Sequence, residues 1–328
     1  MKKTLMQLAQ EEEQNYSSPI VAAKINGEVR DIQSEYDHDD EISFIELNTA
    51  LGWRIYQRSI LFLFIVAVSN MNKEAAVVAK FTVNKGLYCE VKIPGKPINA
   101  HLIHDIEQEM REMIASNTPI VKHSIPRQEA IELFQTRGKR GKAALIDSLP
   151  HPMISIYTCR NYPDYLYGAM LPETKLLGQF ALDVEQSGVL IRTPDEMTDG
   201  KIRTRVEQPK FGHILSEAKE WAKILECPYI SDLNQINTEH RMGELIRISE
   251  ALQEKRIAQI ADHIASHRNN IRLILIAGPS SSGKTSFAQR LQIQLRVNGL
   301  HPIMISLDDY FLNREDTPRN EKGQYDYE

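Results

Sequence analysis

The chain has 328 residues, a length typical of about two globular domains. Its composition, with 42% hydrophobic and 25% charged residues, is that of a folded protein and excludes a disordered tail or a fibrous repeat. The net charge of −5 argues against a dedicated duplex-DNA binder, because such proteins carry a strongly basic face.

Cysteines and apolar runs indicate the compartment. The three cysteines lie far apart and form no CxxC pair, so we expect a reducing, cytoplasmic environment. The most apolar run extends from Ile60 to Val68, which is shorter than the roughly 20 residues of a membrane span. We therefore predict a buried helix there and no membrane partner.

Residues 1–47 predict a small α+β module. Asn26 and Gly27 lie between two apolar segments, and this pair is the strongest short signal for a β-hairpin. The expected elements are a short helix over 4–9 and strands over 21–25, 29–32 and 42–47.

Residues 48–192 predict a larger α+β domain. Asn99 is expected to cap a helix in which apolar residues recur at steps of three and four. The expected helices cover 49–68, 99–114 and 127–135, and the expected strands cover 76–83, 86–93, 153–158, 176–182 and 189–191, with a strand-like piece near Tyr165.

Residues 193–270 predict a linker and a long helix. The polar stretch over 193–208 is typical of a boundary or a mobile loop. Two helices are expected, one over 211–225 and a long one over 238–269 whose apolar side chains form one stripe.

Residues 271–328 contain the motif that carries chemistry. An apolar run over 271–277, which predicts a strand buried on both faces, leads directly into the segment GPSSSGKT. This segment matches the pattern GxxxxGK[ST] at every fixed position, and residues 286–297 predict the helix that should follow. We therefore predict the start of an α/β P-loop NTPase domain, after an α+β front half.

The residue types of this loop suit phosphate. Glycines let successive N–H groups point inward, and the start of the next helix adds partial positive charge. Lys284 can reach the β- and γ-phosphates of ATP as a point charge, and the Thr285 hydroxyl can coordinate Mg²⁺. The predicted ATP-binding residues are Gly278, Pro279, Ser280, Ser281, Ser282, Gly283, Lys284, Thr285 and Ser286.

A second apolar run, over 302–307, predicts another buried strand, which ends in Asp308 and Asp309. In open α/β sheets, ligands bind beyond the carboxyl ends of the strands. Asp308 is therefore the candidate for a base that accepts the proton of an acceptor hydroxyl. The alternative is a strand-end turn with solvated acids.

The segments GPSSSGKTSF and SLDDYF together resemble the uridine kinase and phosphoribulokinase group. Over residues 271–328 this resemblance implies ATP-dependent phosphoryl transfer to a nucleoside 5′-hydroxyl, with Lys284 and Asp308 as catalytic residues. It also implies that Asp308, Tyr310 and Asp326 bind the nucleoside, whose identity stays open. Because these residues supply only two of the strands that such a sheet needs, we expect the chain to be incomplete within this domain and inactive alone.

The front of the chain resembles two domains of threonyl-tRNA synthetase. Residues 1–47 are similar to a TGS domain with AKINGE as its hairpin, and residues 48–192 are similar to the second additional domain, with GLYCE among the matching segments. The metal-binding positions of that editing domain correspond to Arg58, Phe62, Leu166 and Met170. Since none of these side chains is a zinc ligand, we predict no zinc and no editing chemistry.

Two other functions stay open beside the kinase. One is a regulatory nucleotide-binding protein that uses the loop as a switch, and the other is a tRNA-binding module derived from the synthetase. The basic segment 137–142 could contact phosphate or RNA, or it could be a solvated loop. The sequence does not indicate an oligomeric state.

Overall fold

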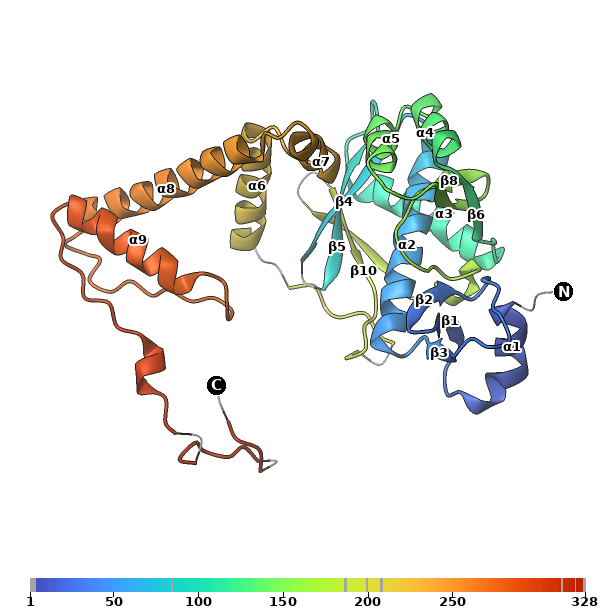
Figure 1. Cartoon of the computed structure of the whole chain (residues 1–328), viewed down its shortest axis with the longest axis horizontal. Helices are drawn as coiled ribbons and strands as arrows, with labels where there is room; N and C mark the ends of the chain where they lie inside the picture. Colours follow the sequence, from blue (N-terminus) through green and yellow to red (C-terminus); the bar gives the residue numbers. More distant parts are fainter. Residues whose placement is uncertain are drawn as a thin grey trace. The chain divides into compact units, whose positions relative to one another are not determined.

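The computed structural model describes residues 4–83, 85–185, 188–198, 200–206, 209–313, 315–321 and 323–326. The chain divides into two compact units, unit 1 from Met1 to Ile214 and unit 2 from Leu215 to Glu328. Figure 1 labels the helices and strands of both units. The architecture is mixed, with three small antiparallel sheets, all of which lie in unit 1 within the described part of the chain.

The N-terminal module of unit 1 forms as the sequence predicts. Helix α1 (Leu5–Glu12) starts at a capping box of Thr4 and Gln7. Asn26 and Gly27 both have positive φ values, 51° and 85°, which a tight hairpin turn between β1 and β2 requires. The sheet has the order β2-β1-β3, and its strands are β1 (Ile20–Ile25), β2 (Glu28–Asp31) and β3 (Ile42–Glu46).

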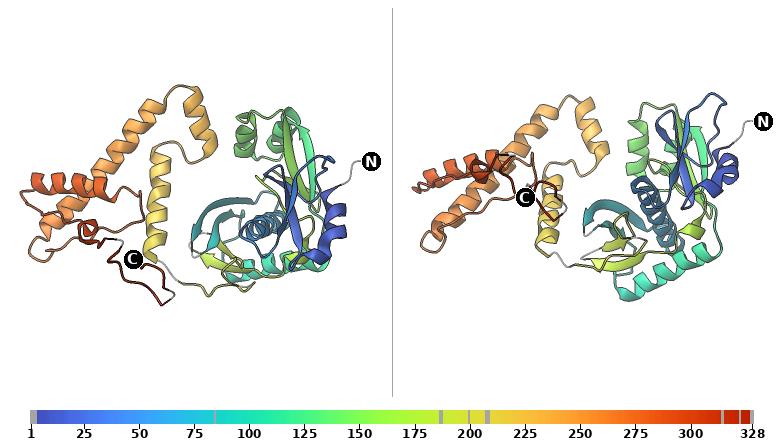
Figure 2. Two further views of the ribbon diagram at one scale, coloured as in Figure 1. Left: turned by 60° about the horizontal axis from the view of Figure 1, so that its bottom comes forward. Right: turned by 90° about the horizontal axis from the view of Figure 1, so that it is seen from below.

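Helix α2 (Ala50–Met71) forms the centre of the unit 1 core. Thr49 caps it by accepting a hydrogen bond from the N–H of Gly52. It is long and apolar enough to cross a membrane, but 72% of its most apolar window is buried inside the protein, as expected of a core helix. Figure 2 shows α2 nearly end-on, inside the curve of the four-stranded sheet. The predicted buried helix is therefore confirmed.

The four-stranded sheet has the order β4-β5-β10-β9, and all of its pairs are antiparallel. Helix α3 (Ala100–Ala115) begins at the predicted cap, where the Asn99 side chain accepts from the N–H of Leu102 at 2.9 Å. The strands are β4 (Ala76–Val83), β5 (Gly86–Lys92), β9 (Ala181–Glu185) and β10 (Gly188–Arg192). The strand predicted over 176–182 is wrong in its first part, where a short 3-10 helix, η2 (Thr174–Leu176), and a loop precede β9.

A smaller sheet, β6-β7-β8, carries helices α4 and α5 on a second core of its own. Two of these elements, β6 (Val121–Pro126) and α5 (Arg140–Asp147), correct the sequence analysis, which predicted neither. The other three correspond to predicted segments and are α4 (Arg127–Thr136), β7 (Met153–Cys159) and β8 (Tyr162–Asp164).

Unit 2 is helical in its described part. The long helix predicted over 238–269 is α8 (Met242–Ser266), which begins four residues later than predicted. A helix that the sequence analysis did not predict, α7 (Ile230–Thr238), comes before it, and the chain turns between the two at His240, which has a φ of 58°. Helix α6 (Pro209–Ile224) precedes them, across the division between the units. Helix α9 (Lys284–Val297) packs on α8, and the shared core comprises Ile257, Ala261, Ile264, Leu291 and Leu295.

The two strands predicted over 271–277 and 302–307 are wrong for this structure. Neither segment belongs to a sheet, and several of their apolar side chains are exposed, Leu275 to 83% and Ile303 to 87%. A buried parallel strand needs hydrogen-bonded neighbours and helices on both faces. The described part of unit 2 offers no neighbouring strand, so neither segment has a ladder to join.

Candidate functional site

The 278–285 loop lies between an extended segment and α9. Ser281 and Gly283 have positive φ values of 61° and 83°, so the backbone reverses sharply just before the helix. Gly283 is the N-cap residue of α9 in the left-handed region, a conformation that favours glycine. The predicted loop-to-helix connection is thus present, and α9 begins two residues earlier than the sequence indicates.

The start of α9 leaves backbone donors available. The first intrahelical bond runs from the N–H of Phe287 to the Gly283 carbonyl at 2.9 Å, and no side chain caps the helix. The N–H groups of Lys284, Thr285 and Ser286 therefore have no acceptor among the described residues. Three such donors at the positive end of a helix form a site that suits an anion.

Lys284 and Thr285 are the side chains at the start of α9 that were predicted to bind ATP and Mg²⁺. The Lys284 ammonium donates to the carbonyls of Gly278 and Pro279 at 2.9 and 3.1 Å, so it lies over the loop. The Thr285 side chain is exposed and makes no hydrogen bond with another described residue. Its hydroxyl fits as one Mg²⁺ ligand, because Mg²⁺ takes its other ligands from phosphate oxygens and water.

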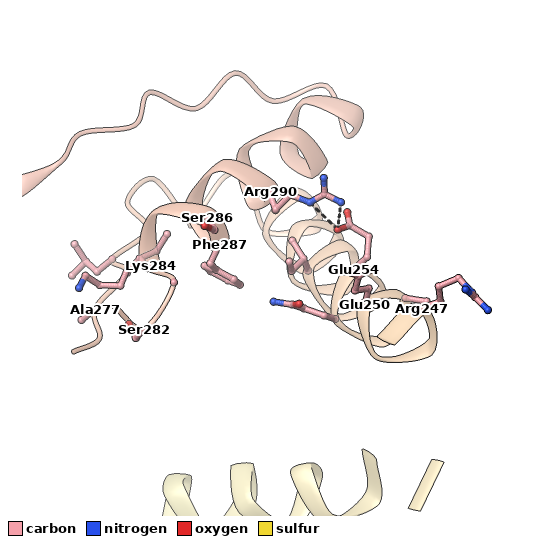
Figure 3. A pocket seen from close by; sticks show the side chains of 15 residues that line it. Arg247, Glu250, Glu254, Ala277, Ser282, Lys284, Ser286, Phe287 and Arg290 are labelled. Carbon is pink, nitrogen blue, oxygen red and sulfur yellow. Dashed lines mark hydrogen bonds and ion pairs between the residues drawn. The ribbon is translucent and has the colours of Figure 1, made fainter. Parts of the chain in front are cut away.

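A cavity of about 1060 Å³ adjoins the loop within unit 2. Ser282, Gly283 and Lys284 line it at one end, where Figure 3 places the Lys284 side chain beside Ala277. Phe287 lies farther along, and one face of α8 lines the other end with Glu250 and Glu254. The volume is at the upper end of the roughly 300–1,000 Å³ of small-molecule sites.

The far end of the cavity contains a charged pair. Arg290 of α9 donates two hydrogen bonds to one oxygen of Glu254, at 3.0 and 2.6 Å, and Gln294 donates to the other oxygen at 2.6 Å. The hydrogen bonds from Arg290 and Gln294 hold the pKa of Glu254 below its usual range. Glu254 is thus a fixed carboxylate, and the sequence analysis missed it because its partners are about 40 residues away.

The predicted substrate residues lie outside this cavity. Asp308 and Tyr310 belong to an exposed 3-10 turn, η3 (Leu307–Tyr310), and Asp326 is exposed near the end of the chain. None of the three is among the described residues that line the cavity. Their roles, and the role of Asp308 as a base, stay predictions that no contact in the described chain tests.

The four positions compared with editing-site ligands lie in the core of unit 1. Phe62 and Met170 are fully or almost fully buried there, and Leu166 packs against the same cluster. The Arg58 guanidinium donates to the carbonyl of Ala169 at 2.5 Å. Burial lowers the pKa of Arg58, while Tyr157 and Asp31 act in the opposite direction. Side chains of this kind pack and pair, and the predicted absence of zinc stays a prediction.

A buried polar cluster around Asp31 joins the N-terminal module to the rest of unit 1. Asp31 is only 4% exposed. Its carboxylate accepts from the Tyr157 hydroxyl at 2.7 Å, from the Lys122 ammonium at 2.5 Å and from the N–H of Met170 at 3.0 Å. The pKa of Tyr157 is raised by burial and by the neighbouring Asp31 charge. These contacts span more than 90 residues of sequence and could not be read from any local motif.

The basic segment 137–142 is mostly engaged in holding the fold. The Lys142 ammonium pairs with Asp164, which is 1% exposed, and the Lys139 ammonium donates to the Ala75 carbonyl at 2.9 Å. Burial and the neighbouring Lys142 lower the pKa of Lys139. The solvated-loop interpretation holds in part, because four of the six residues are exposed, while the second half of the segment starts α5 and both of its lysines have partners in the fold.

Known proteins show what the chain resembles. It is 25% identical over 224 residues to threonine–tRNA ligase from Methylococcus capsulatus, which covers 68% of this chain and 34% of the relative. The ligase from Xanthomonas euvesicatoria is 28% identical over 181 residues (55% and 28%), and that from Paracidovorax citrulli is 29% identical over 163 residues (49% and 25%). The chain thus spans about a third or less of these relatives, and no family model matches it.

Each matched stretch is longer than the whole of unit 2, so each must include part of unit 1. Threonine–tRNA ligase is another name for threonyl-tRNA synthetase, and the predicted resemblance to that enzyme is confirmed. The prediction of a nucleoside kinase is wrong, together with the transferase activity and the uridine substrate. These three relatives are threonine–tRNA ligases and not kinases.

Proposed function

We propose that the protein is a regulatory nucleotide-binding protein built on a module derived from threonyl-tRNA synthetase. Residues 1–47 form its TGS-like part, and residues 48–192 form an editing-domain-like part in which core side chains replace the metal ligands. The 278–286 segment binds the phosphates of ATP with Mg²⁺. It binds the nucleotide as a signal and does not transfer a phosphoryl group.

One observation carries the nucleotide-binding proposal. The N–H groups of residues 284–286 at the start of α9 have no acceptor among the described residues, and Lys284 and Ser286 line a cavity large enough for a nucleotide. The Lys284 ammonium lies over the same loop. Backbone donors, a helix N-terminus and a lysine are the groups that bind phosphates in Gly-rich loops. When ATP binds, Lys284 exchanges its two carbonyl contacts for phosphate oxygens, which are stronger partners because they are charged.

The similarity to a tRNA ligase supports a second candidate, in which unit 1 binds tRNA. Such binding would not need the editing chemistry that the side chains at 58, 62, 166 and 170 do not suit. It would fall steeply as salt is added, because phosphate contacts release counterions.

Calorimetric titration of the whole chain with ATP and MgCl2 tests the proposal. Lys284→Ala should weaken ATP binding by about 10- to 100-fold, the value of one charge-assisted hydrogen bond. Lys255→Ala is the matched control, because Lys255 is exposed on α8 and does not line the cavity. Undiminished ATP binding by Lys284→Ala, or no binding by the wild type, would contradict the proposal.

Two further measurements separate the alternatives. No ADP should form from ATP in the presence of any nucleoside, because the proposal includes binding alone. Fluorescence anisotropy with labelled tRNA tests the second candidate: binding should weaken with added salt and should be the same in Lys284→Ala as in the wild type. A flat titration would remove tRNA binding and leave the nucleotide proposal standing.

A further inference from the structure

The two ends of the cavity beside the loop differ in charge. Lys284 and the start of α9 make the loop end positive. Arg247, Glu250, Glu254 and Arg290 line the α8 end, so that end carries two charges of each sign, and Arg290 pairs with Glu254. The net attraction for a polyanion therefore lies at the loop end, and the α8 end suits the uncharged part of a ligand.

The chemistry between the two ends is apolar. The half-buried Phe287 lies between Lys284 and the glutamates in Figure 3, and the buried side chain of Ile257 lines the cavity near it. An aromatic ring here can pack against another flat ring, a contact worth about 1–3 kcal/mol for a nucleobase. The middle of the cavity thus suits an aromatic group.

Glu250 is a carboxylate at the α8 end that the fold does not use. It is exposed, lines the cavity and makes no ion pair or hydrogen bond with another described residue. A carboxylate only accepts hydrogen bonds, so its partner in a ligand must carry O–H or N–H donors. Sugar hydroxyls and the amino groups of nucleobases are such donors.

We propose that the cavity binds the nucleoside part of a nucleoside triphosphate, with Phe287 against the base and Glu250 accepting a hydrogen bond from the nucleoside. This inference rests on the proposed nucleotide-binding function. It adds that α8 is part of the ligand site and that the loop recognises the whole nucleotide instead of its phosphates alone. Phe287 and Glu250 are the residues that distinguish a nucleotide from inorganic polyphosphate.

The test compares ATP with inorganic tripolyphosphate, both with MgCl2, by calorimetric titration of the whole chain. Wild-type protein should bind ATP at least about 10-fold more tightly, the equivalent of about 1.4 kcal/mol. Glu250→Ala should weaken ATP binding and leave tripolyphosphate binding unchanged or tighter. The direction of the change in ATP affinity decides between the two roles of Glu250. If its negative charge only repelled phosphates, removing it would tighten the binding of both ligands.

Phe287→Leu should also weaken ATP binding and spare tripolyphosphate, since leucine keeps the apolar packing on α8 but lacks the flat ring. Glu244→Ala is the matched control: it makes the same substitution on α8, at a residue paired with Arg241 and outside the cavity lining. It should change neither affinity. Circular dichroism of each variant checks that the helices are intact.

Four outcomes would overturn the inference. Equal affinity of the wild type for ATP and tripolyphosphate, or tighter ATP binding by Glu250→Ala, would do so while the proposed function stands. Equal weakening of both ligands by Phe287→Leu would show a general effect on the loop. Absence of binding by either ligand to the wild type would contradict the proposed function as well.

Discussion

Two apolar runs in this chain differ in how far they are buried. Ile60 to Val68 in α2 of unit 1 is almost completely buried, and Ile60 and Leu63 are 0% exposed. Residues 271–277 in unit 2 are as apolar, yet Leu273 and Leu275 are 74% and 83% exposed. Both runs predict a buried element, and only one of them forms it.

The difference lies in how each run satisfies its backbone. A helix makes its N–H···O=C bonds internally, so α2 needs only side-chain neighbours to be buried. A strand needs another strand to pair with, and residues 272–277 make no backbone hydrogen bond to any described segment. An apolar pattern therefore predicts a buried strand only where a second strand is present to pair with it.

Buried polar groups also differ between the two units. The buried polar or charged residues of the described chain all lie in unit 1, and they are Asp31, Ser59, Thr118, Asp164, Thr174 and Thr193. Unit 2 has a small core between α8 and α9, and its charged groups are at the surface or in the cavity. Among the described residues, unit 1 therefore buries polar groups within its core and unit 2 does not.

Of the changes that test this difference between the units, Asp31→Ala should lower the free energy of unfolding of unit 1 the most. It leaves the Lys122 ammonium and the N–H of Met170 without their buried acceptor, and breaking a buried pair in this way costs about 3–5 kcal/mol. The measurement is urea unfolding followed by Trp53 fluorescence in a Trp221→Phe background, because Trp53 lies in unit 1 and Trp221 in unit 2.

Asp147→Ala serves as the control for this change, since Asp147 is exposed at the end of α5. It should alter the free energy of unfolding by no more than about 0.5 kcal/mol. A loss of similar size in the two variants would show that the Asp31 cluster contributes nothing special to unit 1.

The sequence predicted those elements whose signals are local. The Asn26-Gly27 turn, the Thr49 and Asn99 caps and the loop before α9 each depend on a few neighbouring residues. Strand β6 was missed because it is largely exposed and lacks a clean apolar alternation. Lys139 and Lys142 resembled a solvated loop because their partners, Ala75 and Asp164, are 64 and 22 residues away.

In the candidate site, too, the sequence predicted the features that depend on neighbouring residues and missed those that depend on distant ones. The motif alone identified the loop and Lys284, because the spacing of glycines and lysine is local. The α8 wall with Glu250 and Glu254 depends on the packing of two helices, which no motif encodes. The predicted strand-end position of Asp308 depended on a sheet, and without that sheet Asp308 lies in an exposed turn.

The second prediction makes the same substitution in the two apolar runs. Leu63→Ala should cost unit 1 about 2–5 kcal/mol, because it leaves a cavity in a close-packed core. Leu275→Ala should cost about 0.5 kcal/mol or less, because its side chain is already in water. Urea unfolding measured by Trp53 and by Trp221 reports each unit. A large loss for Leu275→Ala would show that residues 271–277 are buried in solution, and the comparison would fail.

The smallest expected effect concerns the free energy of unfolding of unit 1 at alkaline pH. Burial raises the pKa of Tyr56 to about 12 from its ordinary 10, although the hydrogen bond with the N–H of Gln179 lowers it in part. Between pH 10 and 12 the unfolded chain therefore releases this proton while the folded chain keeps it, and the free energy of unfolding falls as the pH rises.

The fall should be of the order of 3 kcal/mol for this group, since the pKa is raised by about two units and each unit corresponds to about 1.4 kcal/mol. Tyr56→Phe should cost about 1 kcal/mol at neutral pH through its lost bonds to Gln179, and it should flatten the alkaline slope. Urea unfolding measured by circular dichroism across this pH range gives both quantities. If the slope is equally steep in Tyr56→Phe, other groups cause the alkaline loss, and Tyr56 is not held as tightly in the core as the structure shows.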